Sequence, residues 1–134
     1  MARLKAMGTA GRSRDMPTRP GEAKLPAARV FDLAALADYA ELAVVSRTLV
    51  ENAAGTVTLF AFDAGQGLSE HTAPFDALVQ VLDGEGTFIV GGKRRRVGAG
   101  NVLLMPANVP HAVKAAAPFK MLLTMLRAKG DRKA

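Results

Sequence analysis

Apolar and polar residues alternate along most of the chain after residue 44. The segment TVTLFAF at 56–62 places Val57, Leu59 and Ala61 on one face, with threonines and phenylalanines on the other, which is the period of a β-strand. Other segments rich in β-branched residues predict further strands. The expected strands lie at 44–50, 56–62, 77–82, 87–90, 93–97, 102–105, 111–115 and 119–126.

Glycine-rich turns separate these strands. Gly91-Gly92 lies between two of them, and a Gly-Gly pair is typical of a two-residue hairpin because both positions can take a positive φ. Further turns are expected at 84–86 and 98–100. Many short strands, almost no helix and no internal repeat predict an all-β sandwich or small barrel.

One short helix is expected before the first strand. The sequence VFDLAALADY at 30–39 is rich in alanine and leucine, and Asp32 is placed to cap a helix of one or two turns. An extended arm at 29–32 followed by such a turn fits the same residues equally well.

The start of the chain differs in composition from the rest. Glycines, prolines and the lack of an apolar period predict a flexible basic N-terminal arm over 1–28, a single folded domain over 29–127 and a C-terminal tail over 128–134. Residues 1–29 hold seven Lys and Arg against two acidic residues, so most of the net charge of +6 belongs to the arm. A true start at Met16 and an organelle transit peptide are alternatives for this stretch.

Composition excludes several classes of protein. The chain has no cysteine, which rules out disulfides and thiolate metal sites and agrees with a cytoplasmic location. No apolar run approaches the roughly 18 residues of a membrane helix, so no membrane partner is expected. The chain has no Ser-His-Asp or Cys-His arrangement and no phosphate loop, so neither covalent catalysis nor nucleotide binding is expected.

A basic run, KRRR at 93–96, follows the expected hairpin turn. We expect it to form a solvated sheet edge, where charge discourages edge-to-edge pairing. With one tyrosine and no tryptophan, the chain lacks the aromatic stacking platform of a single-strand binder. This argues against a nucleic-acid partner.

The first of two motif-like stretches contains His71. Gly65 is followed by five residues and then His71, and Gly84 closes the stretch. Ala73 lies two residues after the histidine, and Ala77 lies seven residues before Gly84.

The second stretch contains His111, the other histidine of the chain. Gly100 leads by five residues to Pro106, Asn108 and His111 follow, and Ala115 lies four residues beyond the histidine. Asn108 is expected to take the left-handed conformation that such a turn requires.

Together the two stretches resemble the two motifs of the cupin superfamily, over about 50 residues. The resemblance implies a single-domain cupin-type double-stranded β-helix, a jelly-roll barrel. In the family pattern, a second histidine stands at Ala73, a glutamate at Ala77, a glycine at Asn108 and an asparagine at Ala115.

The resemblance also implies a metal-ligand set that this chain keeps only in part. Cupins that bind a metal use three histidines and one glutamate, and only His71 and His111 remain. A divalent transition metal takes three or four protein ligands. Asp76 is a candidate third ligand if a β-bulge turns it inward, whereas Gln80 is expected to point away. Whether a divalent transition metal is bound stays open.

We expect the two histidines to face each other across the barrel interior, at the polar end of an apolar pocket. There they can bind a polar group or transfer protons near neutral pH. Alternatively, each is held by a backbone partner and lines an unused cavity. The pocket walls expected from strand parity are Phe75, Val79, Val81, Met105, Val109, Val113, Met121 and Met125.

These residues predict a small-molecule-binding protein of unknown ligand with a degenerate metal site. A metal-dependent enzyme of isomerase, decarboxylase or dioxygenase type using His71 and His111 is the first alternative, and an interaction module that docks through its basic arm is the second. The strand at 119–126 is apolar on both faces, and a sheet with two apolar faces must cover both. Cupins commonly dimerise through the N-terminal sheet, so the resemblance implies a homodimer.

Overall fold

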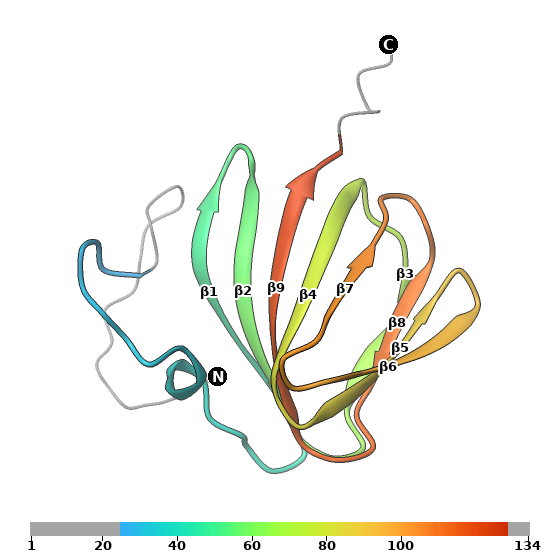
Figure 1. The fold of residues 1–134 in the computed structure, drawn as a ribbon, viewed down its shortest axis with the longest axis horizontal. Helices are drawn as coiled ribbons and strands as arrows, with labels where there is room; N and C mark the ends of the chain where they lie inside the picture. The colour runs from blue at the N-terminus through green and yellow to red at the C-terminus, as the bar shows by residue number, and fades with distance from the viewer. Residues whose placement is uncertain (1–24, 129–134) are drawn as a thin grey trace.

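The computed structural model describes residues 25–128, and these form a nearly all-β fold, as predicted. Most of the expected arm and tail lie outside the described residues. Figure 1 shows two sheets facing each other, with the chain before the first strand beside the larger one. The elements are a 3₁₀ helix η1 (Leu33–Leu36) and the strands β1 (Val44–Asn52), β2 (Gly55–Phe62), β3 (Gly67–His71), β4 (Phe75–Asp83), β5 (Glu85–Val90), β6 (Lys93–Gly98), β7 (Val102–Met105), β8 (His111–Lys114) and β9 (Phe119–Arg127).

The two sheets are antiparallel and of unequal size. The larger has the strand order β1-β2-β9-β4-β7 and the smaller β3-β8-β5-β6. Strand β9 therefore lies in the middle of the larger sheet, between strands from early and central parts of the chain (Figure 1). Neighbours in space that are distant in sequence are typical of a jelly roll.

Strand β3 is the one strand that the sequence pattern did not predict. Its sequence GLSEH has a single apolar residue, Leu68, and four of its five residues are exposed. It forms by pairing with β8, not by burying a face of its own. A short polar strand gives no alternation signal.

A core of apolar side chains fills the space between the sheets. Ala77, Val79 and Val81 of β4 all point inward, as their spacing predicts. Phe119 is fully buried and stacks on Phe62, with ring centroids 4.7 Å apart. The core comprises Phe62, Ala77, Val79, Val81, Phe88, Val97, Met105, Val113, Ala115, Phe119, Met121 and Leu123.

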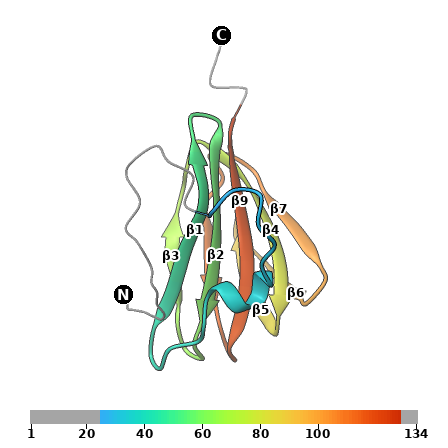
Figure 2. The same cartoon turned by 90° about the vertical axis from the view of Figure 1, so that its left-hand side faces the viewer.

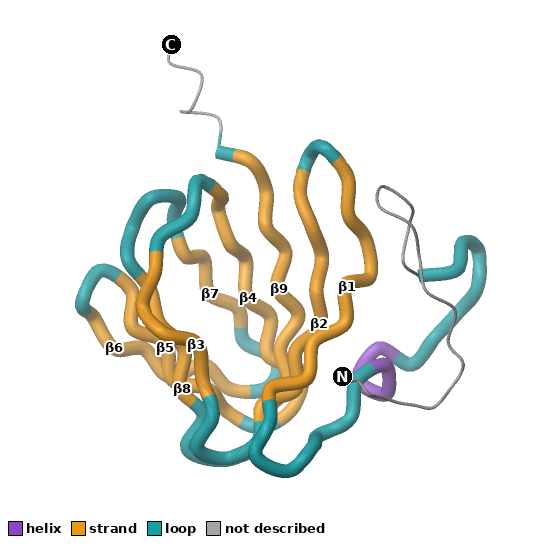
Figure 3. Tube along the Cα trace, turned by 180° about the vertical axis from the view of Figure 1, so that it is seen from behind, coloured by secondary structure: helices purple, strands orange, loops and turns teal. Residues whose placement is uncertain are grey.

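The segment containing η1 covers part of the outer face of the larger sheet, as Figures 2 and 3 show from two sides. Leu36 and Ala37 pack on Leu59 and Ala61 of β2, forming a second, smaller core. The helix is confirmed, but as a single 3₁₀ turn. The predicted capping role of Asp32 is wrong, because its side chain makes no cap hydrogen bond. Packing on the sheet, not capping, holds this turn in place.

Two turns have the backbone that the sequence predicted. Gly91 and Gly92, between β5 and β6, have φ of 57° and 81°. Asn108 has a φ of 64°, so it takes the left-handed conformation expected at its position. Within residues 25–128, no helix is long and apolar enough to cross a membrane.

Candidate functional site

His71 and His111 lie side by side on neighbouring strands of the smaller sheet. Their Cα atoms are direct partners in the β3–β8 ladder, and the ring centroids are 4.4 Å apart at an interplanar angle of 69°. The expectation that the rings face each other across the barrel interior is therefore wrong, since both come from one sheet. The predicted proximity of the two rings is present all the same.

A β-bulge in β3 brings His71 to this position. Leu68 pairs with Val113 and His71 pairs with His111. Two residues of β3, Ser69 and Glu70, therefore lie opposite the single residue Ala112 of β8. Because paired residues lie on the same face of a sheet, His71 shares the face of Leu68 and Val113. Val113 belongs to the core, so this is the inner face.

Each imidazole uses one nitrogen to bind the backbone. His71 Nδ1 lies 2.8 Å from the carbonyl oxygen of Ser69, and His111 Nδ1 lies 3.2 Å from that of Val109. A carbonyl can only accept, so both Nδ1 atoms carry the hydrogen and donate it. In the neutral rings the lone pair is then on Nε2, the arrangement found in histidines that bind a ligand or a metal.

The two rings differ in exposure. His111 is buried, with 6 % of its surface exposed, whereas His71 is exposed. Burial lowers the pKa of His111 below its usual 6.5, and the neighbouring His71 lowers it further, while the hydrogen bond to Val109 opposes the shift. His111 is therefore a neutral hydrogen-bond acceptor at pH 7, beside the exposed ring of His71.

Asp76 does not join the histidine pair. Its Oδ1 accepts a hydrogen bond of 2.9 Å from the backbone N–H of Ala107. No bulge turns it inward, because the next residue, Ala77, is the one that faces the core. The prediction of Asp76 as a metal ligand is therefore wrong: it holds the turn that leads into β8.

The other two motif positions bear only methyl groups. Ala77 is 2 % exposed and pairs with Met105 and Met125 in the adjacent strands. The carbonyl oxygen of Ala73 accepts a hydrogen bond of 2.8 Å from the N–H of Asn108. No cluster of three or more His, Cys, Asp or Glu able to hold a metal ion occurs in the described part of the chain. Two imidazoles alone do not fit a divalent transition metal.

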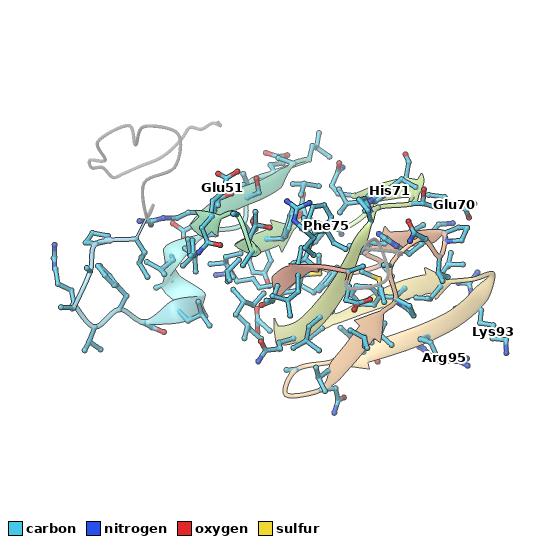
Figure 4. The ribbon with its side chains drawn as sticks, turned by 90° about the horizontal axis from the view of Figure 1, so that it is seen from above. Glu51, Glu70, His71, Phe75, Lys93 and Arg95 are labelled. Atoms are coloured by element: carbon cyan, nitrogen blue, oxygen red, sulfur yellow. The ribbon has the colours of Figure 1, made fainter. Side chains whose placement is uncertain are left out.

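The residues expected to form the pocket walls lie mostly in the core. Val79, Val81, Met105 and Met121 are almost completely buried there. Phe75 lies at the start of β4, half-buried, with the Arg127 guanidinium 5.5 Å from its ring centroid. Figure 4 shows Phe75 and His71 on neighbouring parts of the chain, away from Lys93 and Arg95 on the β5–β6 hairpin.

A cavity of about 570 Å³ is present beside the smaller sheet, and of the residues expected to form pocket walls only Val113 lines it. Sequence analysis missed it, although alternation in HAVK and KRRRV already put Lys114 and Arg94 on the faces opposite Val113 and Val97. The residues lining it include Gln66, Ser69, Thr87, Arg94, Lys114 and Ala116.

A two-sheet antiparallel fold with two motif histidines on adjacent strands defines a jelly-roll protein of the cupin type. Residues 58–125 match the cupin domain family, and the chain belongs to that family. The comparison with curated protein sequences found no significant match.

Solved structures agree with the family. A conserved protein of unknown function from Streptococcus pyogenes is 31% identical, with a TM-score of 0.76 over 84% of this chain and 99% of that one. A cupin superfamily protein from Desulfitobacterium hafniense is 30% identical, with a TM-score of 0.74 over 81% of this chain and 100% of that one. A cupin 2 conserved barrel domain protein from Leptotrichia buccalis is 44% identical, with a TM-score of 0.71 over 72% of this chain, which spans only 47% of that protein.

Proposed function

We propose that this cupin binds a small molecule through the Nε2 atoms of His71 and His111. The observation that carries the proposal is the pair of Nδ1 hydrogen bonds to Ser69 and Val109, which leave both Nε2 atoms for a ligand. Because His111 is neutral, its Nε2 accepts a hydrogen bond. Leu68, which is partly exposed on the same face, provides an apolar contact beside the rings. A ligand with a hydroxyl group on a small apolar body fits this combination.

The two imidazoles allow a direct test by NMR, because the chain has no other histidine. Simple phenols and short hydroxy acids are titrated while the ring protons of both histidines are observed, with His71→Ala used to assign them. A binder is expected to shift both rings and to bind about tenfold more weakly to His111→Ala, which removes a hydrogen bond in a desolvated site. If no compound moves either ring, or if His111→Ala binds equally well, the proposal fails.

The alternative function is a metal-dependent enzyme of isomerase, decarboxylase or dioxygenase type. It is favoured by the two free Nε2 atoms on adjacent strands and opposed by the methyl groups of Ala73 and Ala77. Elemental analysis of untagged protein, with His71→Ala beside it, separates the two functions. A stoichiometric transition metal that is lost in the variant would establish a metal site and replace the first proposal.

Restoring the missing ligands tests the geometry behind both functions. The variant carrying Ala73→His and Ala77→Glu is expected to bind Zn²⁺ far more tightly than the parent chain, because four donors then complete the set. The matched control carries Ala73→His with Gln80→Glu, whose carboxylate lies on the outer face of β4. Equal affinity of the two variants would mean that position 77 does not face the histidines.

We further propose that the protein is a homodimer joined through the outer face of the larger sheet. The η1 segment covers only part of that face. Beyond it, a stripe of outward residues crosses the sheet from β1 to β7, in register: Val50, Val57, Thr124, Leu78 and Leu104. Leu104 is 55% exposed and nearby Leu126 is 52% exposed. Contiguous apolar surface of this kind marks an interaction site, and a second copy is its simplest partner.

A further inference from the structure

The cavity on the smaller sheet lies on the face opposite the histidines. Lys114 pairs with Thr87, whereas the adjacent pair, Val113 with Phe88, points into the core. Because successive side chains point to opposite faces, Lys114 and Thr87 are on the outer face. Ile89 lies two residues after Thr87 on β5, so its side chain is on the outer face as well. Arg94 pairs with Ile89, and the Arg94 side chain is therefore also on the outer face.

The hollow beside Lys114 exists because its partner in β3 is Gly67. A Cβ atom at Gly67 would lie 2.3 Å from the carbonyl oxygen of Val113, so only glycine allows the two strands to approach this closely. Backbone hydrogen bonds from Gly65 N to Ala115 O (2.7 Å) and from Ala115 N to Gln66 O (2.9 Å) continue the ladder past β3. These bonds fix the wall of the cavity.

The charge in the cavity is of one sign. Arg94 and Lys114 line it, no acidic residue does, and within residues 25–128 neither side chain forms an ion pair. The nearest outward carboxylate of β5, Glu85, lies 3.9 Å from Arg96. On β3, Glu70 is exposed but does not line the cavity. Two unpaired cations in a hollow attract an anion.

The remaining lining supplies neutral hydrogen-bond donors and some apolar surface. The Thr87 and Ser69 hydroxyls and the Gln66 amide can donate hydrogen bonds, and Ala116 is apolar. A volume of about 570 Å³ lies within the range of sites for small organic molecules. Arginine presents a planar fork of donors that matches a carboxylate or phosphate.

We propose that this cavity is a second binding site, which takes a small organic oxyanion between Arg94 and Lys114. The anionic group lies against the two cations and the Thr87 hydroxyl, and its apolar body lies against Ala116. The site is separate from the histidine pair, although the two share residues. Ser69 lines the cavity while its carbonyl oxygen holds His71, and Leu68 and Val113, which pair with each other in the β3–β8 ladder, also line the cavity. It does not depend on the proposed function of the histidines.

The test uses the full chain and two probes that share a phenyl body, phenyl phosphate and benzoate, followed by backbone NMR. Saturable shifts at Gly67, Ser69, Thr87 and Ala116 are expected, and the tighter probe identifies the kind of oxyanion. Absence of shifts at these amides with both probes overturns the proposal without any variant being needed.

Matched variants separate a specific site from general attraction to a basic protein. Arg94→Gln with Lys114→Gln is expected to weaken binding about tenfold or more, because a hydrogen bond to a charged group contributes at least that factor. The control, Lys93→Gln with Arg95→Gln, loses the same charge from the opposite face of β6, where Figure 4 shows both residues on the hairpin. Equal weakening in the two variants overturns the proposal.

A third variant keeps the two proposals distinguishable. His71→Ala with His111→Ala is expected to bind the oxyanion probe with unchanged affinity, because the rings are on the inner face. If this variant loses the probe, the anion binds at the histidines and the outer site is wrong. If this variant still binds the oxyanion probe, but phenols and hydroxy acids do not bind to the histidines of the parent chain, only the function proposed for the histidines fails.

Discussion

At the scale of single residues, His111 makes stability depend on pH. Its pKa in the folded protein is lowered from 6.5, chiefly by burial, so the unfolded chain binds a proton more readily. The free energy of unfolding is therefore expected to fall as the pH drops below 6.5 through the lowered folded-state pKa. His111→Gln should remove this part of the slope in urea denaturation at a series of pH values.

The same shift can be observed directly. His71→Gln is expected to raise the pKa of His111, because the positive charge of a protonated neighbour is removed. NMR titration of the ring protons measures both values. A His111 that titrates at or above 6.5 in the parent chain would contradict the account of a buried neutral acceptor.

Gly86 is required for packing, not for turn geometry. A Cβ atom there would lie 2.5 Å from the Phe119 ring. That ring cannot move away, because it stacks on Phe62 and meets Phe88 edge-on with centroids 6.0 Å apart. Gly86→Ala is expected to lower the free energy of unfolding by about 1–3 kcal/mol through overpacking.

A matched glycine on the neighbouring strand serves as the control for Gly86. The nearest atom to a Cβ at Gly98 would be the Asn101 side-chain oxygen at 3.7 Å, an ordinary contact. Gly98→Ala should therefore change the free energy of unfolding by no more than about 0.5 kcal/mol in the same denaturation experiment. Equal losses for the two variants would argue against the clash.

Sequence reasoning located the two histidines but not their geometry. The spacing of the motif stretches predicted that His71 and His111 would come together, and they do. It could not predict the bulge, because one extra residue in β3 is visible only against the register of β8. Nor could it predict that Asp76 would be held by the N–H of Ala107, since that bond joins residues 31 apart.

At the scale of elements, the η1 segment is fastened to the larger sheet by polar contacts as well as by its apolar side chains. Tyr39 donates a hydrogen bond of 2.5 Å to Asp83, and Lys120 donates one of 2.6 Å to the carbonyl oxygen of Ala34. The Lys120 ammonium also lies 5.0 Å from the centroid of the Tyr39 ring. A segment with only a single helical turn of its own is therefore held in one position on the sheet.

These contacts predict an unusual titration of Tyr39. Burial, the hydrogen bond to Asp83 and the charge of Asp83 all raise the pKa of its hydroxyl well above the usual 10. Tyr39 is the one tyrosine and there is no tryptophan, so tyrosinate absorbance reports it alone. Asp83→Asn is expected to bring the pKa back towards 10. Since the raised pKa disfavours ionisation in the folded state, stability from this contact is expected in full below pH 10 and is lost as the pH rises from 10 through the raised pKa.

The control for the Tyr39 titration is Glu85→Gln, two residues along the chain from Asp83 and paired instead with Arg96. It removes the same charge without touching the hydroxyl, so the titration should not move. A Tyr39 that ionises near pH 10 in the parent chain would show that the segment is not fastened as described.

At the scale of elements, the sequence predicts best those strands that bury one apolar face. Every strand predicted from alternation is present, because burial of that face drives both the pattern and the structure. The 3₁₀ turn and β3 are set by tertiary contacts, with β2 and β8 respectively. Local residues do not encode such contacts, and for this reason the capping role that the sequence predicts for Asp32 is wrong.

At the scale of the whole molecule, the exposed stripe on the larger sheet predicts the oligomeric state. Light scattering after size exclusion is expected to give twice the chain mass for the parent protein. Leu104→Glu, at the β7 end of the exposed stripe, should give a monomer, because burying a charged side chain in an apolar interface without a partner is costly.

The control for Leu104 is Leu42→Glu. Leu42 is 73% exposed, more than Leu104, but precedes β1 and lies outside the stripe. This variant should stay dimeric. A parent chain that runs as a monomer at all concentrations, or a Leu104→Glu variant that remains dimeric, would contradict the proposed interface.

The position of β9 has a consequence for how the protein is made. This strand fills the gap between β2 and β4, so the larger sheet has no continuous ladder until residue 127 has left the ribosome. Until then the β1–β2 hairpin and the β4–β7 pair each present an open edge and a bare apolar face. The nascent chain is thus most exposed to aggregation, and most in need of a chaperone, just before β9 is synthesised.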